Sequence, residues 1–177
     1  MNGQGARDVL PDPKRLRNAF GTFATGVTVV TVGGARPRGM TANSFTAVSL
    51  DPPLVLVCVG REAVMNGLLE RAETFGISVL SAEQEEVARH FANPSRPDGA
   101  DQFEPVAWTA GTAADAPLLD GAVAHFECER WREYDGGDHA IHIGRVLGMA
   151  VAPERDGLVF HRGRFATLAA APRGVPA

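Results

Sequence analysis

The segment RGMTANSFTAVSLDPPLVLV, residues 38–57, changes character halfway along its length. Its first half is small and polar, whereas its second half is a nearly continuous apolar run that follows Pro52 and Pro53. Because proline has no N–H to donate to a β-ladder, the two prolines predict a break before a buried strand over residues 54–59. The first half is predicted to form the preceding strand, to continue to about Val48 and to pair with its neighbour in the sequence.

The first half of this segment lacks the bulk that holds most strands in a core. Two interpretations follow from its composition. It is either an edge strand that is polar because it is solvated, or a surface on which a flat ligand lies close to the backbone, whose N–H and C=O groups contact the ligand's edge. In the second interpretation four side chains supply hydrogen-bonding groups to a phosphate or a carbonyl: Asn43, Ser44, Thr46 and Ser49.

The sequence on both sides predicts further strands, joined mainly by hairpins. Alternating or β-branched runs predict strands over residues 27–32, 75–80, 122–134 and 138–151 and around 158–161. Helices are predicted from Pro13 to Gly26, over residues 62–72, and from Ser81 to about Phe91, with Gln84 completing a capping box and a loop over residues 93–101. The absence of regular βαβ alternation favours a mainly β fold, an antiparallel barrel with attached helices.

The composition limits the classes of function open to the chain. A length of 177 residues, with 45% hydrophobic and 21% charged residues, is typical of one soluble globular domain. A net charge of −4 without a basic stripe argues against nucleic-acid binding, and no apolar run reaches the roughly 18 residues of a membrane span. We expect a domain over residues 14–168, a flexible lead-in over residues 1–13 that is not a secretory signal, and a flexible tail over residues 169–177.

Motifs for several other chemistries are missing. The sequence has no G-x-G-x-x-G dinucleotide loop, no phosphate-binding P-loop and no G-x-S-x-G nucleophile motif. Cys58 and Cys128 lack metal-type spacing and are predicted to be reduced, buried thiols of a cytoplasmic protein. His139 and His142 point to opposite faces of a regular strand, so they cannot chelate one ion and no metal site is predicted.

Two motifs near the C-terminus contain candidate functional side chains. In GGDHAIHIGRV, His139 follows a Gly-Gly turn and is predicted to lie at the rim of the barrel, where functional residues are common, whereas His142 is predicted to be hydrogen-bonded and half-buried. In FHRGRF, Arg162 and Arg164 flank Gly163, an arrangement that suits an anionic or stacking ligand and, equally, a solvated turn. Three glutamates of the strand before these motifs are predicted to form its solvated face: Glu127, Glu129 and Glu133.

Four segments together resemble the short-chain flavin reductase family, which has the FMN-binding split-barrel fold. They occur in the family's order and spacing: FATGVTVVT (residues 23–31), GMTANSFTAVSLDPPLVLVCV (39–59), GDHAIHIGRV (137–146) and LVFHRGRF (158–165). The resemblance implies a six-stranded antiparallel split β-barrel with flanking helices, which dimerises with flavin near the subunit interface. It also implies that the chain is the NAD(P)H:flavin oxidoreductase component of a two-component flavin-dependent monooxygenase.

The resemblance also implies roles for individual residues. Those along the flavin ring are Met40, Thr41, Ala42, Asn43 and Ser44, and those near the ribityl chain and the first phosphate are Thr46, Val48 and Ser49. Arg61 occupies a phosphate-binding position, but the three residues that depart from the family's usual pattern leave the choice between FMN and FAD open: Ala63, Val64 and Asn66. Phe103 belongs to the loop that covers the flavin. His139, the one candidate catalytic residue, lies next to the nicotinamide in a pocket shaped by Arg162 and Phe165.

We therefore expect an enzyme that transfers a hydride from NADH, or NADPH, to FMN or FAD and releases the reduced flavin to a partner monooxygenase without needing a stable complex. The cofactors supply this chemistry and the protein orients them, so no protein acid–base pair is expected. The expected form is a cytoplasmic homodimer with no nucleic-acid or membrane partner. The alternative is a flavin storage or sensor protein on the same barrel. An oxidase of the pyridoxamine-phosphate type is disfavoured because the sequence shows no basic phosphate cluster.

Overall fold

The computed structural model describes residues 12–168, which form three sheets and a few short helices. The helices are α1 (Pro13–Phe20), α2 (Val64–Leu69), α3 (Glu85–Ala92) and the 3₁₀ turn η1 (Gly99–Phe103). The strands are β1 (Thr25–Gly26), β2 (Thr28–Val32), β3 (Arg38–Ala42), β4 (Thr46–Leu50), β5 (Pro53–Gly60), β6 (Thr74–Val79), β7 (Trp108–Ala110), β8 (Pro117–Leu119), β9 (Ala124–Gly136), β10 (His139–Val151), β11 (Leu158–His161) and β12 (Arg164–Thr167). The predicted lead-in lies outside the described residues except for its last two positions, and the predicted tail lies entirely outside them.

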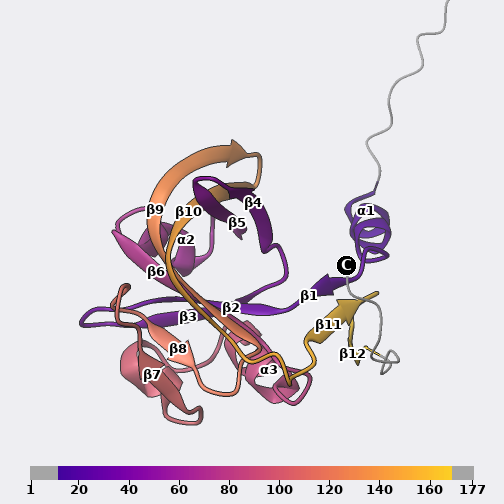
Figure 1. The fold of residues 1–177 in the computed structure, drawn as a ribbon. Helices are drawn as coiled ribbons and strands as arrows, with labels where there is room; N and C mark the ends of the chain where they lie inside the picture. The colour runs from indigo at the N-terminus through magenta and orange to yellow at the C-terminus, as the bar shows by residue number, and fades with distance from the viewer. Residues whose placement is uncertain (1–11, 169–177) are drawn as a thin grey trace, which may run out of the picture.

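Seven strands form the main sheet, in the order β3-β2-β6-β9-β10-β5-β4, and each neighbouring pair is antiparallel. This sheet is strongly curved, and α1 lies to one side of it together with the small sheet of β1, β11 and β12 (Figure 1). β3 and β4 are consecutive in the sequence but form opposite edges of the sheet. Because only residues 43–45 join them, the curvature brings the two edges within a short span of each other at this point.

The prediction of one strand from residue 38 to Val48 is wrong, because the chain leaves the sheet at Asn43 and re-enters it on the other edge. β3 pairs with β2, whereas β4 pairs with β5 across the turn at Asp51 and Pro52. The predicted break at the prolines falls in this turn, although β5 already begins at Pro53. The predicted mainly β, antiparallel architecture is confirmed, with seven strands in the main sheet instead of six.

Two hydrophobic cores cover the two faces of this sheet. Alternate residues of β5, Val55, Val57 and Val59, are at most 4% exposed, because the two-residue period of a strand turns them to one face. The same alternation divides β2, whose Val30 enters the core under α2 while Val29 enters a second core with residues of α3 and η1. Packing on both faces therefore holds β2 and its edge neighbour β3 in place.

The long β9–β10 hairpin supplies much of the curvature. Its register shifts between Ile143 and Gly144 and again between Val146 and Gly148, and such bulges bend a strand and increase its twist. At Gly144 on β10 a Cβ would lie 2.5 Å from the ring of Phe75 on β6, so glycine leaves room for that ring. The turn uses Gly137 and Asp138, one position later than the predicted Gly-Gly pair.

The helices are shorter than predicted. α1 ends at Phe20 because the chain then forms β1, which pairs with β11. α2 covers only part of residues 62–72, and α3 begins at Glu85, after the predicted cap. Gln84 accepts the Ser81 N–H at 3.0 Å, but the buried Ser81 hydroxyl has no hydrogen-bond partner among residues 12–168, so only half of the capping box forms. Within residues 12–168, no helix has the length and apolar character needed to cross a bilayer.

Besides β1, which lies where a helix was predicted, the sequence analysis missed three short strands: β7, β8 and β12. β7 and β8 form a two-stranded sheet in the segment between η1 and β9, and β12 completes a hairpin with β11. Each has only three or four residues, too few for alternation to stand out. Such short strands are recognised by their partners rather than by their own pattern.

His142 on β10 is 1% exposed, and its Nε2 lies 2.9 Å from Oδ1 of Asn66 on α2. The Asn66 amide nitrogen donates to Glu70 at 2.7 Å, so the amide oxygen faces His142 and Nε2 carries the donated proton. Nδ1 has no hydrogen-bond partner in the described part of the chain and lies 3.8 Å from a carboxylate oxygen of Glu133. Burial lowers the pKa of His142, and the Glu133 charge opposes this shift. His142 is therefore hydrogen-bonded as predicted, but it is fully rather than half buried.

We expect the free energy of unfolding to decrease as the pH falls below about 6.5, the ordinary pKa of histidine. The unfolded chain protonates His142 near that pH, whereas the folded chain keeps it neutral to a lower pH, so the unfolded state binds more protons in this window. His142→Gln keeps an N–H donor for Asn66 but has no imidazole to protonate. Its free energy of unfolding is therefore expected to decrease less over the same pH range. Melting curves between about pH 8 and 5 measure this effect. A variant that loses stability as steeply as the wild type would contradict the assignment.

Candidate functional site

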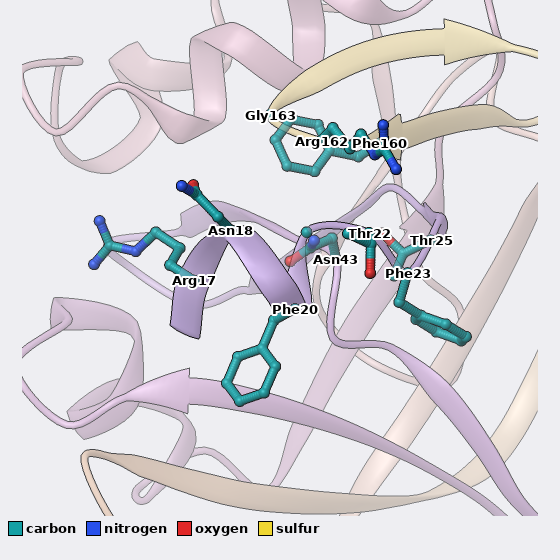
Figure 2. A pocket seen from close by; sticks show the side chains of 11 residues that line it. Arg17, Asn18, Phe20, Thr22, Phe23, Thr25, Asn43, Phe160, Arg162 and Gly163 are labelled. Atoms are coloured by element: carbon teal, nitrogen blue, oxygen red, sulfur yellow. The ribbon is translucent and has the colours of Figure 1, made fainter. Parts of the chain in front are cut away.

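A cavity of about 660 Å³ lies between α1, β1, the turn that joins β11 to β12, and Asn43 (Figure 2). We call it the Asn43 cavity. Its size is within the range of small-molecule sites, roughly 300–1,000 Å³. Its walls are formed by Arg17, Asn18, Phe20, Gly21, Thr22, Phe23, Thr25, Asn43, Phe160, Arg162 and Gly163. Two arginines and three phenylalanines around one space suit a flat ligand that carries negative charge.

The β11–β12 hairpin forms one wall of this cavity. Arg162 and Gly163, the two residues of its turn, have φ values of 49° and 76°. Two successive positive φ values are typical of the two-residue turns whose twist matches that of the flanking strands. The Arg162 N–H donates to the carbonyl of Gly21 at 2.7 Å, which holds the turn against the end of α1. The predicted pocket residue Arg162 therefore lines the cavity.

The wall formed by α1 and the residues after it was missed by the sequence analysis. The helical spacing of Phe20 and Phe23 predicts one apolar face, yet no residue of α1 is buried, and the two side chains are 69% and 77% exposed. Figure 2 shows both rings beside the cavity. Spacing alone does not distinguish an aromatic face that packs in a core from one that lines a site.

Asn43, Ser44 and Phe45 cross between the two sheet edges beside this cavity. The Ser44 hydroxyl donates to the Cys58 carbonyl at 2.9 Å and accepts the Cys58 N–H at 3.0 Å, so it takes the place of a strand neighbour and holds the crossing against β5. Among the described residues, none accepts a hydrogen bond from the three backbone N–H groups of the crossing. The crossing thus combines the small polar side chains of Asn43 and Ser44 with free backbone donors, which fit the carbonyl and ring-nitrogen acceptors of a flavin.

The structure separates the other residues predicted to lie along the flavin ring. Ala42 is 8% exposed and belongs to the core. Met40 and Thr41 line a second cavity, of about 420 Å³, between β3, α2 and the segment after α3. The Thr41 hydroxyl donates to the carbonyl of Ala88 at 2.7 Å and so fixes α3 against β3. Only Asn43 of this group lines the Asn43 cavity, and the flavin contacts of all five residues stay predictions.

His139 and Arg61 lie together where β5 ends and β10 begins, and neither lines the Asn43 cavity of its own chain. The His139 side chain is 48% exposed, and its Nδ1 is 2.7 Å from a carboxylate oxygen of Asp138. This hydrogen bond, and then the histidine charge, lower the pKa of Asp138. Arg61 donates to the carbonyl of Gly137 at 2.9 Å and pairs with Asp135. Its guanidinium therefore holds the β9–β10 turn, so fewer of its N–H donors remain for the predicted phosphate contact.

The remaining predicted residues lie outside the Asn43 cavity. Thr46, Val48 and Ser49 are on the edge strand β4, where Val48 is 45% exposed. Phe103 is 2% exposed and packs between Phe91 and Trp108, so it is a core residue in this structure. Phe165 packs against Phe160, with ring centroids 5.3 Å apart. The contacts of these residues with flavin or nicotinamide stay predictions.

Glu127 does not belong to a solvated glutamate face, as the sequence analysis predicts. It is 9% exposed, and one carboxylate oxygen accepts the N–H groups of Ala113 and Ala114 at 2.6 and 2.7 Å. Burial, and then the Glu127 charge, raise the pKa of Cys128 to about 12, and burial raises the pKa of Cys58. Both cysteines are free, as predicted. Raised pKa values keep them as thiols, which agrees with the absence of a nucleophile motif.

Sequence comparison identifies related proteins over nearly the whole chain. Residues 20–169 match the family model described as the flavin reductase like domain. The chain is 58% identical over 159 residues to an NADH-dependent FAD reductase of Streptomyces globisporus, with 88% of this chain and 87% of that protein covered. It is 39% identical over 176 residues to an NADH-dependent flavin reductase of Rhodococcus sp, with 97% and 96% covered.

Solved structures agree with this result. The NADH:FAD oxidoreductase of Streptomyces globisporus C-1027, in complex with NAD and FAD fragments, has a TM-score of 0.86 at 54% identity, with 94% of this chain and 99% of that chain covered. BorF, the flavin reductase component of a bacterial two-component tryptophan halogenase, has a TM-score of 0.86 at 52% identity, with 90% and 100% covered. The predicted split-barrel class is confirmed. The chain belongs to the flavin reductase family.

Proposed function

We propose that this chain is an NADH-dependent flavin reductase that reduces FAD or FMN and supplies the reduced flavin to a monooxygenase. The observation that carries the proposal is the crossing at residues 43–45, where free backbone donors lie beside a cavity walled by aromatic side chains and Arg162. The Streptomyces relative is named an NADH-dependent FAD reductase. Relatives of Acinetobacter baylyi and Rhodococcus jostii are named reductase components of flavin-dependent monooxygenases.

The chain's own contribution is to position its ligands and to exclude water. Flavin and nicotinamide supply the hydride chemistry when bound. The N–H groups of the crossing would hold the edge of the flavin ring, and Phe20, Phe23 and Phe160 would cover the bound rings and so keep water from them. Holding two rings in a reactive arrangement removes much of the entropic barrier. No side chain in the Asn43 cavity has to transfer a proton.

His139 is proposed to position the nicotinamide. The Asn43 cavity of one chain does not include His139, so this role requires a dimer in which the flavin lies near the subunit interface. His139→Ala is expected to raise the KM for NADH about fivefold, the effect of losing one hydrogen bond, with the Kd for FAD within about twofold of the wild type. His139→Gln, which keeps a hydrogen-bonding group, is expected to recover part of the loss. Unaltered NADH kinetics in His139→Ala would remove the residue from the site.

The homodimer is supported by exposed apolar side chains on two strands of the main sheet, β4 and β10. Leu50 on β4 is 96% exposed, and Met149 and Val151 on β10 are 70% and 58% exposed. Large apolar side chains exposed on a sheet are typical of subunit interfaces. Sedimentation at micromolar protein concentration measures the state in solution, and a monomer there would contradict the dimer. A cytoplasmic location is proposed from the two free cysteines, and cell fractionation tests it.

Steady-state assays with each pairing of NADH or NADPH with FAD or FMN test the proposed function. Purified protein is expected to oxidise NADH only when flavin is added. A protein that oxidises neither nucleotide with either flavin is not a flavin reductase. Co-elution with a monooxygenase is not expected, because free reduced flavin is sufficient to connect the two reactions.

A further inference from the structure

The β11–β12 hairpin, which forms one wall of the Asn43 cavity, lies at the edge of the small sheet. The strand order β1-β11-β12 leaves β12 with β11 as its neighbour in that sheet. At the turn, the hydrogen bond from the Arg162 N–H to the carbonyl of Gly21 ties the hairpin to the end of α1. Within residues 12–168, no backbone hydrogen bond joins the hairpin to α3. The contact between this wall and α3 is therefore made by side chains.

Phe165 on β12 links the hairpin to α3 through its ring. The guanidinium of Arg89 on α3 lies over this ring, 5.0 Å from the centroid. The ring of Phe160 on β11 lies 5.3 Å away at an interplanar angle of 61°, an edge-to-face arrangement that aromatic pairs favour. A cation over an aromatic face is attracted by the negative charge density of the ring. Arg89 thus holds Phe165, and Phe165 packs against Phe160.

Phe160 connects this stack to the Asn43 cavity. Its ring lines the cavity beside the turn at Arg162 and Gly163, as Figure 2 shows. Neither Arg89 nor Phe165 lines it. The family resemblance places Phe165 at the nicotinamide pocket, and its contact with Phe160 allows it to shape that pocket without touching the ligand.

The position of the Arg89 guanidinium is set by its own helix. Glu85, one turn earlier, accepts hydrogen bonds from Nε at 3.0 Å and from Nη2 at 2.6 Å on one carboxylate oxygen. Side chains four residues apart on a helix are neighbours, which makes this pair possible. The Arg89 side chain is 57% exposed, so the ion pair contributes little to stability. Its effect is to restrict the guanidinium to the place that it occupies over the ring.

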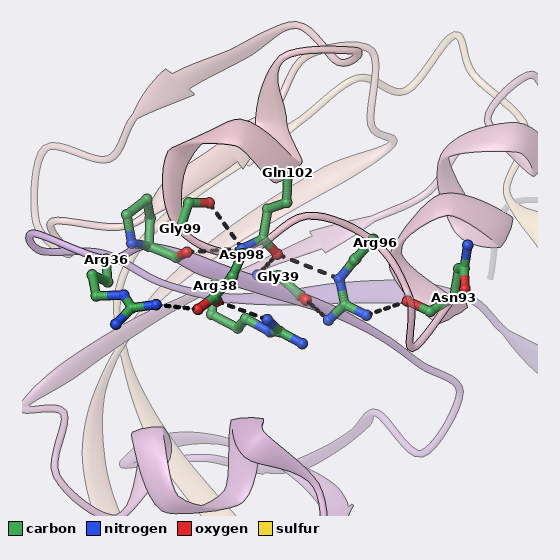
Figure 3. A network of polar contacts seen from close by, with 9 residues as sticks. Arg36, Arg38, Gly39, Asn93, Arg96, Asp98, Gly99 and Gln102 are labelled. Atoms are coloured by element: carbon green, nitrogen blue, oxygen red, sulfur yellow. Dashed lines mark hydrogen bonds and ion pairs between the residues drawn. The ribbon is translucent and has the colours of Figure 1, made fainter.

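α3 is a firm support for its side chains, because its middle and its end are both tied to β3. The Thr41 hydroxyl donates to the carbonyl of Ala88 at 2.7 Å. Beyond the helix, Arg96 donates to the carbonyl of Asn93 at 2.7 Å and also to that of Gly39, within the network of polar contacts in Figure 3. The stack on the hairpin is therefore attached, through α3, to the main sheet.

We propose that Arg89 is a positioning residue for NADH: through Phe165 it keeps Phe160 in the wall against which the nicotinamide packs. The flavin ring has the backbone donors of the crossing at residues 43–45, whereas in this chain the nicotinamide has the aromatic wall. A wall that is fixed before the ligand arrives lowers the entropic cost of ordering it on binding. The proposal rests on the proposed flavin reductase function.

Steady-state kinetics at saturating FAD test this role. Arg89→Gln is expected to raise the KM for NADH about three- to fivefold, the effect of losing one exposed cation–π contact, with kcat within about twofold of the wild type. The Kd for FAD is expected to change less than about twofold, because the crossing is untouched. Arg89→Lys, which keeps a cation for the ring, is expected to recover most of the loss. Glu85→Gln is expected to act in the same direction as Arg89→Gln, but more weakly.

A double-mutant cycle separates positioning from direct contact with the ligand. Phe165→Leu removes the ring but keeps an apolar side chain, and it is expected to raise the KM for NADH at least as much as Arg89→Gln does. If Arg89 acts through this ring, adding Arg89→Gln to Phe165→Leu raises the KM no further. Two effects that multiply would show that Arg89 contacts the ligand itself and would overturn the positioning role.

Arg155→Gln is the matched control. Arg155, in the segment before β11, also pairs with a glutamate, Glu83 at 3.5 Å, and its side chain is 37% exposed. Among residues 12–168, no aromatic ring lies under its guanidinium, and it does not line the Asn43 cavity. The variant removes the same charge as Arg89→Gln and is expected to keep the wild-type KM for NADH.

Hydrogen exchange, followed by mass spectrometry, measures the wall without any turnover. In Arg89→Gln the amides of residues 158–167 are expected to exchange about threefold faster or more, while those of β2 and β6 keep their wild-type rates. Unchanged exchange over residues 158–167 would show that Arg89 does not hold the hairpin and would overturn the proposal. Equal losses in NADH and FAD binding, together with a lower melting temperature, would also overturn it, because they show general support of the fold.

The failure of this proposal and the failure of the proposed function give different results. A wild type that oxidises NADH, combined with an unchanged KM for NADH in Arg89→Gln, refutes the positioning role alone. A wild type that binds FAD but does not oxidise NADH refutes the proposed function, and the exchange measurement then still decides whether Arg89 holds the hairpin.

Discussion

Replacing Asn43 with tryptophan is expected to weaken FAD binding about 10- to 100-fold while the protein stays folded. Asn43 is exposed, lies between β3 and β4 and lines the Asn43 cavity. The indole would therefore fill the cavity in which the flavin is proposed to bind, and it would not enter a core. Fluorescence titration measures the affinity, and the melting temperature checks the fold.

Two comparisons make this result specific. Asn43→Ala removes the amide but not the space, so we expect only a loss of about threefold, the effect of one hydrogen bond. Ala35→Trp places the same bulk in an exposed turn and is expected to have no effect. Ala42→Trp is not a useful variant, because Ala42 is in the core and a bulky replacement there would disturb the fold. An Asn43→Trp protein with wild-type affinity would show that flavin does not lie at the crossing.

Gly33→Ala is expected to lower the free energy of unfolding by more than about 3 kcal/mol. A Cβ at this position would lie 1.3 Å from the backbone carbonyl oxygen of Asp115 and 3.1 Å from Cα of Ala116. No side-chain rotation relieves a collision with backbone atoms, so residues 115–117 must move away from β2. That movement breaks the 2.6 Å hydrogen bond from the buried Thr31 hydroxyl to the carbonyl of Pro117.

Gly157→Ala is the control for this variant, because no atom lies within 4 Å of the Cβ position and the backbone does not have positive φ. It lowers the conformational entropy of the unfolded chain by the same amount as Gly33→Ala does, an effect of less than about 1 kcal/mol on the free energy of unfolding. Thermal or urea unfolding compares the two proteins. Similar melting temperatures for Gly33→Ala and the wild type would contradict the close approach of residues 115–117 to the end of β2.

Elements with strong local patterns could be predicted from the sequence. The β-branched run at residues 27–32 became β2, and the run at residues 75–80 became β6, each within one residue at either end. The long hairpin of β9 and β10 was predicted from its alternation and its glycines. In these elements the side-chain period and the turn residues carry the information, and both are local.

The arrangement of the site depends on contacts between distant residues and could not be predicted in the same way. Nothing local to Asn43 indicates that the next strand joins the opposite sheet edge, because β4 is defined by its pairing with β5. Arg38 and Arg96 both line the second cavity, and the sequence analysis did not bring them together. They meet only when the segment after α3 packs beside β3. Glu127 looks like one of three solvated glutamates until the N–H groups of residues 113 and 114 are placed around it.

The central claim is that NADH reduces a flavin held by this chain. It is tested most directly by mixing the purified protein and FAD with NADH in the absence of oxygen and following the absorbance of the flavin. The account predicts that the flavin absorbance bleaches, that one NADH is consumed for each FAD reduced, and that reoxidation by oxygen restores the spectrum. A protein that binds FAD tightly but leaves its spectrum unchanged with NADH and with NADPH would contradict the account and would indicate a flavin storage or sensor protein.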